Sequence, residues 1–274
     1  MSQLCPDPIV VLGAPRSGTT YLRQVLDSHP EVAITNEHRV FEWLRRSLEL
    51  CDDDHAVFEH RDRLRSWLAA DLPRRLRAYY EEVAPGARWW GDKNPHYAAR
   101  PETVETLRAC YPGARLVHIV RDPRAVVASL LRKRNDDGSA WIAAEAAHTM
   151  VVGHVDNARR CVVEAGPQLG YELRYEDLVA DDEGAARGLF AWLGVPFAPA
   201  VESFCRAQSR SRTAFSGPTT ALSDAGAKAH EAWSEAVPAA DQRQSLQFLA
   251  PLLLRHGYET AASLDARNRA LPDA

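Results

Sequence analysis

The sequence contains very little lysine. Of its 33 lysine and arginine residues, only those at positions 93, 133 and 228 are lysines, and arginine supplies the rest. A GC-rich genome produces such a bias, so most of the arginines carry no functional meaning by themselves. The formal net charge is -4 and no long basic run occurs, which argues against general nucleic-acid binding. A lysine that falls inside a motif is therefore a candidate functional residue.

Signals for membrane insertion, secretion and paired cysteines are also missing. No apolar run reaches the ~18–20 residues that a membrane span needs. Residues 1–7 are polar and lack the basic-then-apolar pattern of a signal peptide. The five cysteines stand singly with no CxxC pair, which argues against a zinc ribbon or a disulfide framework. We therefore expect a cytoplasmic protein without a membrane span.

Predicted strands and helices alternate along the chain. Apolar, β-branched runs predict strands at 8–13, 32–35, 88–91, 115–120 and 171–175. Apolar spacing predicts helices at 21–28, 38–50, 56–83, 101–110, 123–132, 139–165, 183–193, 228–236 and 239–256. This alternation indicates an α/β protein with a three-layer P-loop-like fold, in which helices cover both faces of a central parallel sheet.

The chain shows no internal repeat and no linker that marks a domain boundary. We therefore expect one domain over residues 1–274, with a helical insert at 38–85 on the substrate side. The stretch 207–227 is rich in Ser, Thr, Gly and Ala and predicts a loop. Residues 265–274 are expected to form a loose tail.

The strongest local signal is the Gly-Ala-Pro-Arg-Ser-Gly-Thr-Thr string at residues 13–20. It lies between a predicted strand and a predicted helix, the context in which backbone N–H groups and a helix N-terminus hold a phosphate. The spacing of Gly13 and Gly18 is that of a P-loop, but Thr19 stands where a P-loop has lysine. Arg16 offers instead a permanent charge and a fork of donors for a sulfate or phosphate group.

Residues 15–20 (Pro-Arg-Ser-Gly-Thr-Thr) resemble the 5′-phosphosulfate loop of sulfotransferases that use 3′-phosphoadenosine 5′-phosphosulfate (PAPS). With Arg16 and Tyr21, the string looks more like that of protein-tyrosine sulfotransferases and bacterial relatives than like that of many cytosolic members. The resemblance implies that Arg16, Ser17, Gly18, Thr19 and Thr20 bind the nucleotide. It also implies PAPS as co-substrate, and fixed cations can balance the charge in such a reaction without a metal.

A second anion site is predicted after the fourth strand. Residues 121–124 (Arg-Asp-Pro-Arg) and Ser129 resemble the 3′-phosphate signature of the same family. The implied ligands are the Arg121 guanidinium and the Ser129 hydroxyl, which suit a crevice at the carboxyl end of a strand. Tyr175, in a Tyr-Glu-Asp-Leu string, corresponds to a tyrosine near the adenine in the family.

Glu37 and Lys93 are the candidate catalytic residues beside Arg16. Glu37 ends the second predicted strand, so it should face the same crevice as the loop. By resemblance to tyrosine sulfotransferases, Glu37 and Arg39 match a Glu-x-Arg string that holds the base. Lys93 matches a family lysine that contacts the transferring sulfate, where a compact, mobile donor suits better than arginine. His38 is a rival base, and His96 is a further candidate for a supporting role.

The acceptor and some contacts stay open at this point. The resemblance implies a small-molecule hydroxyl acceptor such as a phenol, a sugar, a lipid or a natural product, shaped by aromatic residues of the 38–85 segment. Ser209, Ser211, Arg212 and Ser216 are all candidates for a phosphate contact. The alternatives are a small-molecule kinase of the P-loop type, which needs magnesium, and a nucleotide-binding module without catalysis.

Overall fold

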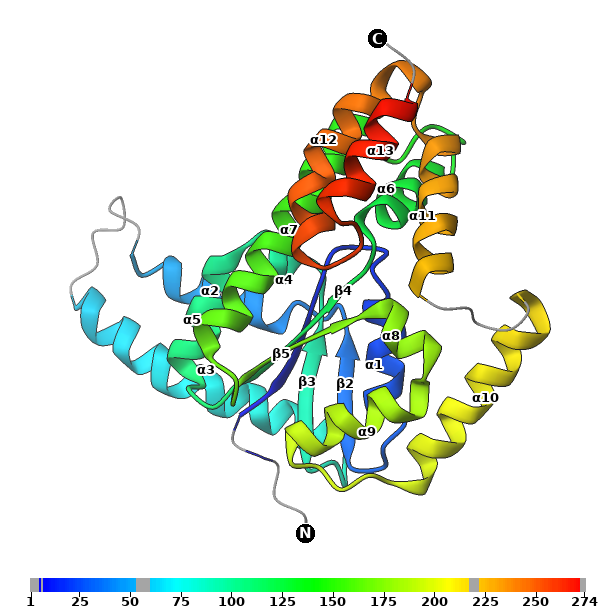
Figure 1. The fold of residues 1–274 in the computed structure, drawn as a ribbon. Helices are drawn as coiled ribbons and strands as arrows, with labels where there is room; N and C mark the ends of the chain where they lie inside the picture. The colour runs from blue at the N-terminus through cyan, green and yellow to red at the C-terminus, as the bar shows by residue number, and fades with distance from the viewer. Residues whose placement is uncertain (1–4, 6, 53–59, 217–221, 272–274) are drawn as a thin grey trace.

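A computed structural model describes residues 5, 7–52, 60–216 and 222–271, with the backbone alone for 211–216 and 222–227. Within these ranges the core is a five-stranded sheet in the order β2-β3-β1-β4-β5 (Figure 1). All neighbouring strands pair in parallel. The strands are β1 (Ile9–Leu12), β2 (Val32–Asn36), β3 (Trp89–Lys93), β4 (Arg115–Val120) and β5 (Gly170–Arg174).

The central strand β1 shows why these residues form a sheet that is buried on both sides. Ile9 and Val11 pack in one hydrophobic core, whereas Val10 packs in the opposite core, as the two-residue period of a strand requires. Gly91 of β3 pairs with Ile9, and a Cβ atom at Gly91 would lie 1.7 Å from the Ile9 carbonyl oxygen. The close pairing of β1 and β3 therefore depends on glycine at this position.

Helices cover both faces of the sheet, so the predicted three-layer α/β fold is confirmed. One core contains side chains of α1 (Thr19–Asp27), α8 (Tyr175–Ala180), α9 (Asp182–Leu193) and α10 (Pro199–Ser216). The opposite core contains side chains of α2 (Val40–Glu49), α3 (Arg61–Val83), α4 (His96–Ala99), α5 (Pro101–Cys110) and α7 (Ala144–Ala165).

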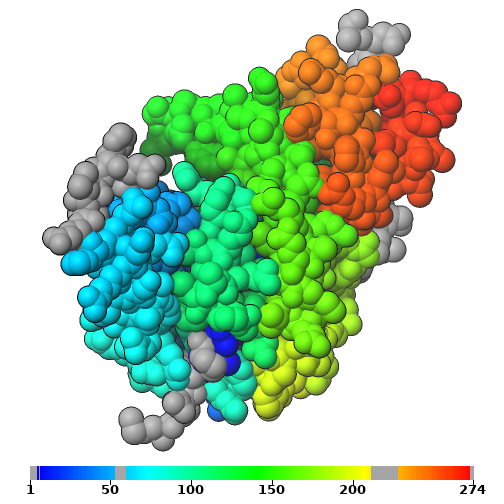
Figure 2. Space-filling model, turned by 90° about the vertical axis from the view of Figure 1, so that its left-hand side faces the viewer, coloured from blue at the N-terminus to red at the C-terminus, as the bar shows by residue number. Residues whose placement is uncertain are grey.

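A third core lies next to the carboxyl ends of the strands. Buried Trp233 packs there with side chains of α6 (Pro123–Arg132), α7, α11 (Leu222–Ala236) and α12 (Ala239–Arg255), and α13 (Ala261–Ala270) follows α12. In Figure 2 the cyan atoms of α3 form one flank, and the orange and red atoms of α12 and α13 lie at the opposite upper corner. Within the described ranges, no helix has the length and apolar character of a membrane span.

Two sequence predictions about irregular segments are wrong. The loop expected at 207–227 is helical up to Ser216 and again from Leu222, and 217–221 lie outside the described residues. The abundant Ser and Thr masked the helix-forming Ala and Arg residues of this stretch. The loose tail expected from 265 is helical up to Ala270. A capping box between Thr260 and Ser263 starts this helix, and the prediction overlooked that cap.

Candidate active site

All five strands deliver their carboxyl ends to one edge of the sheet, and the predicted site residues lie along that edge (Figure 1). The phosphate loop at 13–18 follows β1, and Glu37 follows β2 directly. Lys93 is the last residue of β3, which extends two residues beyond its predicted end. Arg121 follows β4, and Tyr175 begins α8 immediately after β5 rather than ending the strand. Parallel pairing alone therefore gathers the candidate residues.

The loop at 13–18 leaves the start of α1 open for an anion. Arg16 and Gly18 have left-handed backbones, with φ of 73° and 97°. No side chain caps α1 at Gly18, and its first turn holds no acidic residue. The N–H groups of a first helical turn lack intrahelical acceptors and point outward, so they suit a phosphate. Ser17 is buried, and its hydroxyl donates to the Ala14 carbonyl at 2.7 Å, which braces the loop from inside.

Tyr175 packs directly against this loop. A Cβ atom at Gly18 would lie 2.3 Å from Cδ2 of the Tyr175 ring, so only glycine allows this approach. The Arg121 guanidinium lies 4.6 Å from the centre of the same ring, a cation–π contact. Arg121 Nη1 also donates to the Arg16 carbonyl at 3.2 Å. The ring therefore connects the loop after β1 with the arginine after β4.

A cationic cavity of about 590 Å³ opens between these elements. Arg16 Nε donates to Ser129 Oγ across it at 3.0 Å. The cavity is lined by Arg16, Arg121, Ala125, Ser129, Arg132, Lys133, Tyr175, Glu176, Val179, Lys228, Ala229 and Ala232. Five of these side chains carry a positive charge and one an acidic group, so the cavity suits a ligand with several negative charges.

A second polar cluster lies on the other side of the phosphate loop. Lys93 Nζ donates to Glu37 Oε1 at 2.7 Å and to Thr20 Oγ1 at 3.2 Å. The Lys93 side chain is 1% exposed, whereas that of Glu37 is 48% exposed. A buried ammonium group is tolerated when it is paired in this way. The structure therefore brings three of the predicted site residues into one cluster, with the carboxylate open to solvent.

The sequence matches a sulfotransferase family model over residues 8–199, which is more than half of the chain. The chain belongs to the sulfotransferase family. It is 27% identical over 279 residues to protein-tyrosine sulfotransferase 1 of Danio rerio, covering 93% of this chain and 73% of that protein. It is 34% identical over 113 residues to omega-hydroxy-beta-dihydromenaquinone-9 sulfotransferase Stf3 of Mycobacterium bovis, covering 38% of this chain and 28% of that protein.

Comparison with solved structures confirms the sulfotransferase fold. The sulfotransferase domain of the Synechococcus PCC 7002 olefin synthase matches with a TM-score of 0.56 at 21% identity, covering 92% of this chain and 97% of that one. The sulfotransferase domain from the curacin biosynthetic pathway matches with a TM-score of 0.54 at 23% identity, covering 72% of this chain and 77% of that one. The predicted family is therefore confirmed, and the protein is an enzyme of the transferase class.

Several other predicted residues of this sulfotransferase lie apart from the two clusters. The His38 ring contacts the Tyr79 hydroxyl at 3.3 Å. His96 is exposed, and its backbone N–H donates to Asn94 Oδ1. Ser209 is exposed on α10, while the side chains of Ser211, Arg212 and Ser216 lie outside the described part of the chain. Among the described residues, no group of three or more His, Cys, Asp or Glu side chains is arranged to hold a metal ion.

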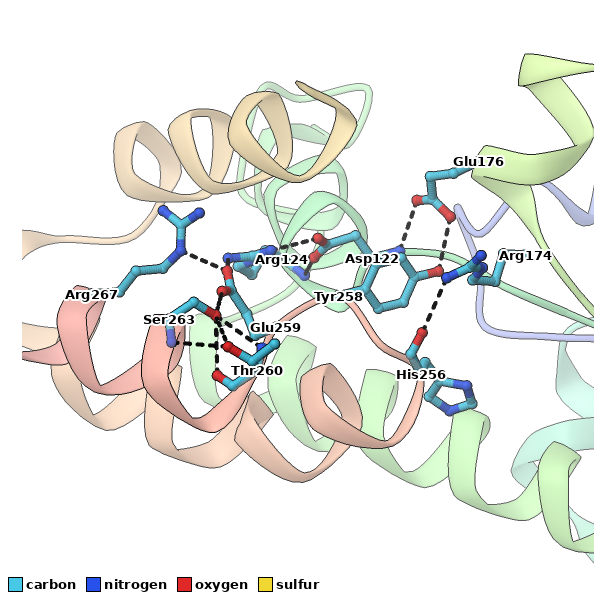
Figure 3. A network of polar contacts seen from close by, with 10 residues as sticks. All are labelled: Asp122, Arg124, Arg174, Glu176, His256, Tyr258, Glu259, Thr260, Ser263 and Arg267. Carbon is cyan, nitrogen blue, oxygen red and sulfur yellow. Dashed lines mark hydrogen bonds and ion pairs between the residues drawn. The ribbon is translucent and has the colours of Figure 1, made fainter. Parts of the chain in front are cut away.

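The sequence interpretation missed a buried network behind the cavity (Figure 3). Glu176 Oε1 accepts from the Asp122 N–H at 3.0 Å, and its Oε2 accepts from the Tyr258 hydroxyl at 2.8 Å. Burial raises the pKa of Glu176, and these two hydrogen bonds oppose the shift. Because Asp122 directly follows Arg121, this contact fixes the strand end that carries the cavity arginine.

Arg124 ties the same region to the C-terminal segment (Figure 3). Its fully buried guanidinium pairs with both oxygens of Asp122 and with Glu259. Burial opposes ionisation of Glu259, but hydrogen bonds from Ser263 and Arg124 hold its pKa below the usual value. Arg267 of α13 completes the network at 2.6 Å from Glu259. The Asp-Pro-Arg string is evident in the sequence. Its partner Glu259, which lies 135 residues after Arg124, could not be predicted from that string.

Proposed function

We propose that this sulfotransferase moves a sulfuryl group from PAPS to the hydroxyl group of an acceptor. The observation that carries the proposal is the position of the Glu37–Lys93–Thr20 cluster beside the cationic cavity. The phosphate loop and the start of α1 join them, because Thr20 of α1 contacts Lys93 while Arg16 of the loop contacts Ser129. A donor with anionic groups at both ends can therefore span from the cavity to a carboxylate that is open to an acceptor.

The cavity fits the nucleotide end of PAPS. Arg121 and Ser129 would hold the 3′-phosphate, because an arginine fork and a hydroxyl are both donors to phosphate oxygens. Lys133 and Lys228 line the same cavity and add charge. Tyr175 would lie near the adenine, and the Gly18 backbone leaves room for its ring. Gly18, Thr19 and Thr20 would offer N–H groups of the α1 start to the 5′-phosphosulfate, with Ser17 bracing the loop.

Glu37 acts as the base in this proposal. Its carboxylate takes the proton of the acceptor hydroxyl, whose oxygen forms a bond to sulfur. The bond between sulfur and the bridging oxygen breaks, and the nucleotide leaves with the electron pair. Protonation of Glu37 removes the negative charge with which Lys93 was paired. The Lys93 ammonium group then becomes available to the bridging oxygen, on which negative charge develops during the transfer.

Arg16 is proposed to support the transferring group. In the structure its guanidinium donates to the Ser129 hydroxyl, so the Arg16 side chain must adopt another rotamer to reach the sulfuryl group. It can also stay in the cavity and donate to the 3′-phosphate together with Ser129. No step of this scheme uses a metal ion, and we propose that turnover continues when magnesium is chelated.

The acceptor is proposed to bind beside α2 and α3. Tyr79 of α3 contacts His38, which follows the base Glu37 in the chain. Trp43 and Trp67 on these helices are 51% and 55% exposed. Exposed aromatic rings on the helices that follow the base suit an acceptor with an apolar body, a description that fits a phenol, a lipid or an aromatic natural product.

The test compares Glu37→Gln with wild type. Binding of 3′-phosphoadenosine 5′-phosphate (PAP) is measured by calorimetry with EDTA present. Transfer of label from [³⁵S]PAPS is measured to a panel of 2-naphthol, 1-dodecanol and a methyl glucoside. We expect PAP to bind both proteins alike and the variant to lose turnover by about 100-fold or more. Glu81→Gln, on the exposed side of α3, is the control that keeps activity.

Three results would overturn the proposal or part of it. Wild-type turnover in Glu37→Gln would remove the base from its role. A wild-type protein that binds PAP and transfers no label to any acceptor would be a nucleotide-binding module. A strict need for magnesium and ATP would instead indicate the kinase alternative.

A further inference from the structure

The turn that carries Glu37 has an unusual backbone. Glu37 and Arg39 both lie in the left-handed region, with φ of 60° and 57°. Residues with a Cβ atom rarely adopt this conformation, so the surrounding structure must hold the turn in place. The groups that hold this turn in place also determine where the Glu37 carboxylate points.

Two backbone N–H groups of this turn and one at the start of α2 donate to β3 and to α4, the helix that follows β3. The Glu37 N–H donates to the Lys93 carbonyl at 2.8 Å. The His38 N–H donates to Asp92 Oδ1 at 3.3 Å, and the Phe41 N–H donates to the Tyr97 hydroxyl at 3.3 Å. The turn between β2 and α2 is therefore fastened at three points.

Asp92 is the centre of this arrangement. Its side chain is fully buried. Thr35 Oγ1 donates to Oδ1 at 2.7 Å, and the Tyr97 hydroxyl donates to Oδ2 at 2.6 Å. Tyr80 extends the network, with its hydroxyl 2.6 Å from Thr35 Oγ1. Thr35 of β2 and Tyr97 of α4 therefore contact the same buried carboxylate.

Such a carboxylate is costly for the fold. Burial raises the pKa of Asp92, and the hydrogen bonds from Tyr97, Thr35 and His38 offset part of this shift. A buried charge without a cationic partner stabilises a protein less than an apolar side chain of the same size. An apolar residue, however, would leave the His38 N–H and the Tyr97 hydroxyl without the acceptor that Asp92 provides, whereas the Thr35 hydroxyl would keep the Gly91 carbonyl as acceptor at 3.1 Å.

We infer that Asp92 is a positioning residue for Glu37: it fixes the left-handed turn through the His38 N–H and through the Thr35 and Tyr97 hydroxyls. Asp92 itself touches no reacting atom. The inference rests on the proposed role of Glu37 as base. The two residues at the end of β3 then have separate roles, because Asp92 orients the Glu37 carboxylate and Lys93 forms an ion pair with it.

The experiment uses substitutions that alter the hydrogen bonds around Asp92. Asp92→Asn, Tyr97→Phe and Thr35→Val weaken the network, and Thr35→Ser retains the hydroxyl. Tyr111→Phe is the matched control, because Tyr111 is also buried in the same core but donates to the Pro73 carbonyl instead. Each protein is assayed for kcat with the most active acceptor of the panel above, and for the Kd of PAP.

We expect kcat of the three weakened variants to fall about 10- to 100-fold, because small displacements of a catalytic group cost that much. The Kd of PAP should stay within about twofold, since the cavity is built by other residues. Thr35→Ser should recover most of the lost kcat. Hydrogen exchange of the peptide covering residues 35–41 should become faster in the weakened variants and stay unchanged in Tyr111→Phe.

The outcomes separate this inference from the proposed function. If Glu37→Gln is inactive while Asp92→Asn, Tyr97→Phe and Thr35→Val match Tyr111→Phe in both kcat and exchange, Asp92 is not a positioning residue. If Glu37→Gln keeps turnover, the base assignment fails first. If Asp92→Asn does not fold, the comparison of Thr35→Val with Thr35→Ser decides the question.

Discussion

Arg16 Nε donates a hydrogen bond to Ser129 Oγ at 3.0 Å, although the two residues are 113 positions apart. The family resemblance assigned Arg16 to the sulfuryl end of the nucleotide and Ser129 to the 3′-phosphate end. The structure places both at one cavity, where the arginine fork takes the hydroxyl as acceptor. A phosphate oxygen is a stronger acceptor and would receive hydrogen bonds from both side chains.

Ser129→Ala should weaken binding of PAP. A hydrogen bond to a charged group contributes about 1.5–3 kcal/mol, so the Kd should rise about tenfold or more. Adenosine 5′-monophosphate lacks the 3′-phosphate, and its affinity should not change. Calorimetric titration of both nucleotides checks this, with Ser47→Ala on α2 as the control. Equal losses for both nucleotides would show that Ser129 does not hold the 3′-phosphate.

Gly18→Ala should abolish the fit between the phosphate loop and the Tyr175 ring. The added Cβ atom would lie 2.3 Å from that ring. Gly86→Ala is the matched control, because Gly86 has a similar φ of 95° but no atom within 4 Å. Both variants carry the backbone strain of a left-handed alanine, about 1 kcal/mol. Only Gly18→Ala should also lose affinity for PAP. An equal loss of affinity in Gly18→Ala and Gly86→Ala would mean that backbone strain alone causes it.

Lys93→Arg should keep the charge and lose most of the turnover. The Lys93 side chain is 1% exposed, so the larger guanidinium has no room between Glu37 and Thr20. Loss of a group that stabilises developing charge costs about 100-fold or more in kcat. Lys93→Met retains the shape without the charge and should be equally inactive while still binding PAP. Wild-type turnover in Lys93→Arg would contradict the proposed role.

Arg124→Met should destabilise the protein strongly. The substitution leaves the buried carboxylates of Asp122 and Glu259 without their common cation. Removal of one partner of a buried pair costs about 3–5 kcal/mol in the free energy of unfolding. Arg255→Met breaks an exposed pair with Asp156 and should cost less than about 1 kcal/mol. Urea unfolding measures both, and similar small losses would refute the importance of the network in Figure 3.

Acid should destabilise the fold partly through His256. Burial lowers the pKa of His256 from 6.5 to about 4. The unfolded chain then binds a proton that the folded chain does not, so stability is complete above pH 6.5 and falls between pH 6.5 and 4. The contribution reaches about 3 kcal/mol at the low end. In His256→Gln the free energy of unfolding should depend less on pH over this range, and an unchanged pH dependence would contradict the assignment.

The sheet and most of its helices were predictable because they follow from local patterns. Apolar β-branched runs marked the strands, and the Asp122 cap with Pro123 marked the start of α6, where the Arg124 N–H donates to Asp122. The common edge of parallel strands predicted that Glu37 faces the loop around Arg16, whereas the role of Lys93 was inferred from the family resemblance. Whether a segment forms a strand or a helix could therefore be predicted from its hydrophobic periodicity and its helix caps, which are local features of a few residues.

The remaining features depend on contacts between distant segments. Asp92 lies beyond the predicted end of the third strand, and only the pairing of β2 with β3 brings Thr35 and the His38 N–H onto it. Glu259 appeared in a segment expected to be near a loose tail, yet it is the partner of Arg124. Ser-rich composition hid α10, because burial of Val201 and Cys205 outweighs weak helix propensity there.

The scarcity of lysine has a practical consequence, because all three lysines lie around one edge of the sheet. Lys93 is buried beside Glu37, while Lys133 and Lys228 are exposed and line the cavity. An amine-selective acylating reagent therefore meets two exposed ε-amino groups, those of Lys133 and Lys228, and both line the cavity. If the nucleotide occupies this cavity as proposed, it should protect both amines, and the mass increment of the intact chain should be smaller when PAP is present.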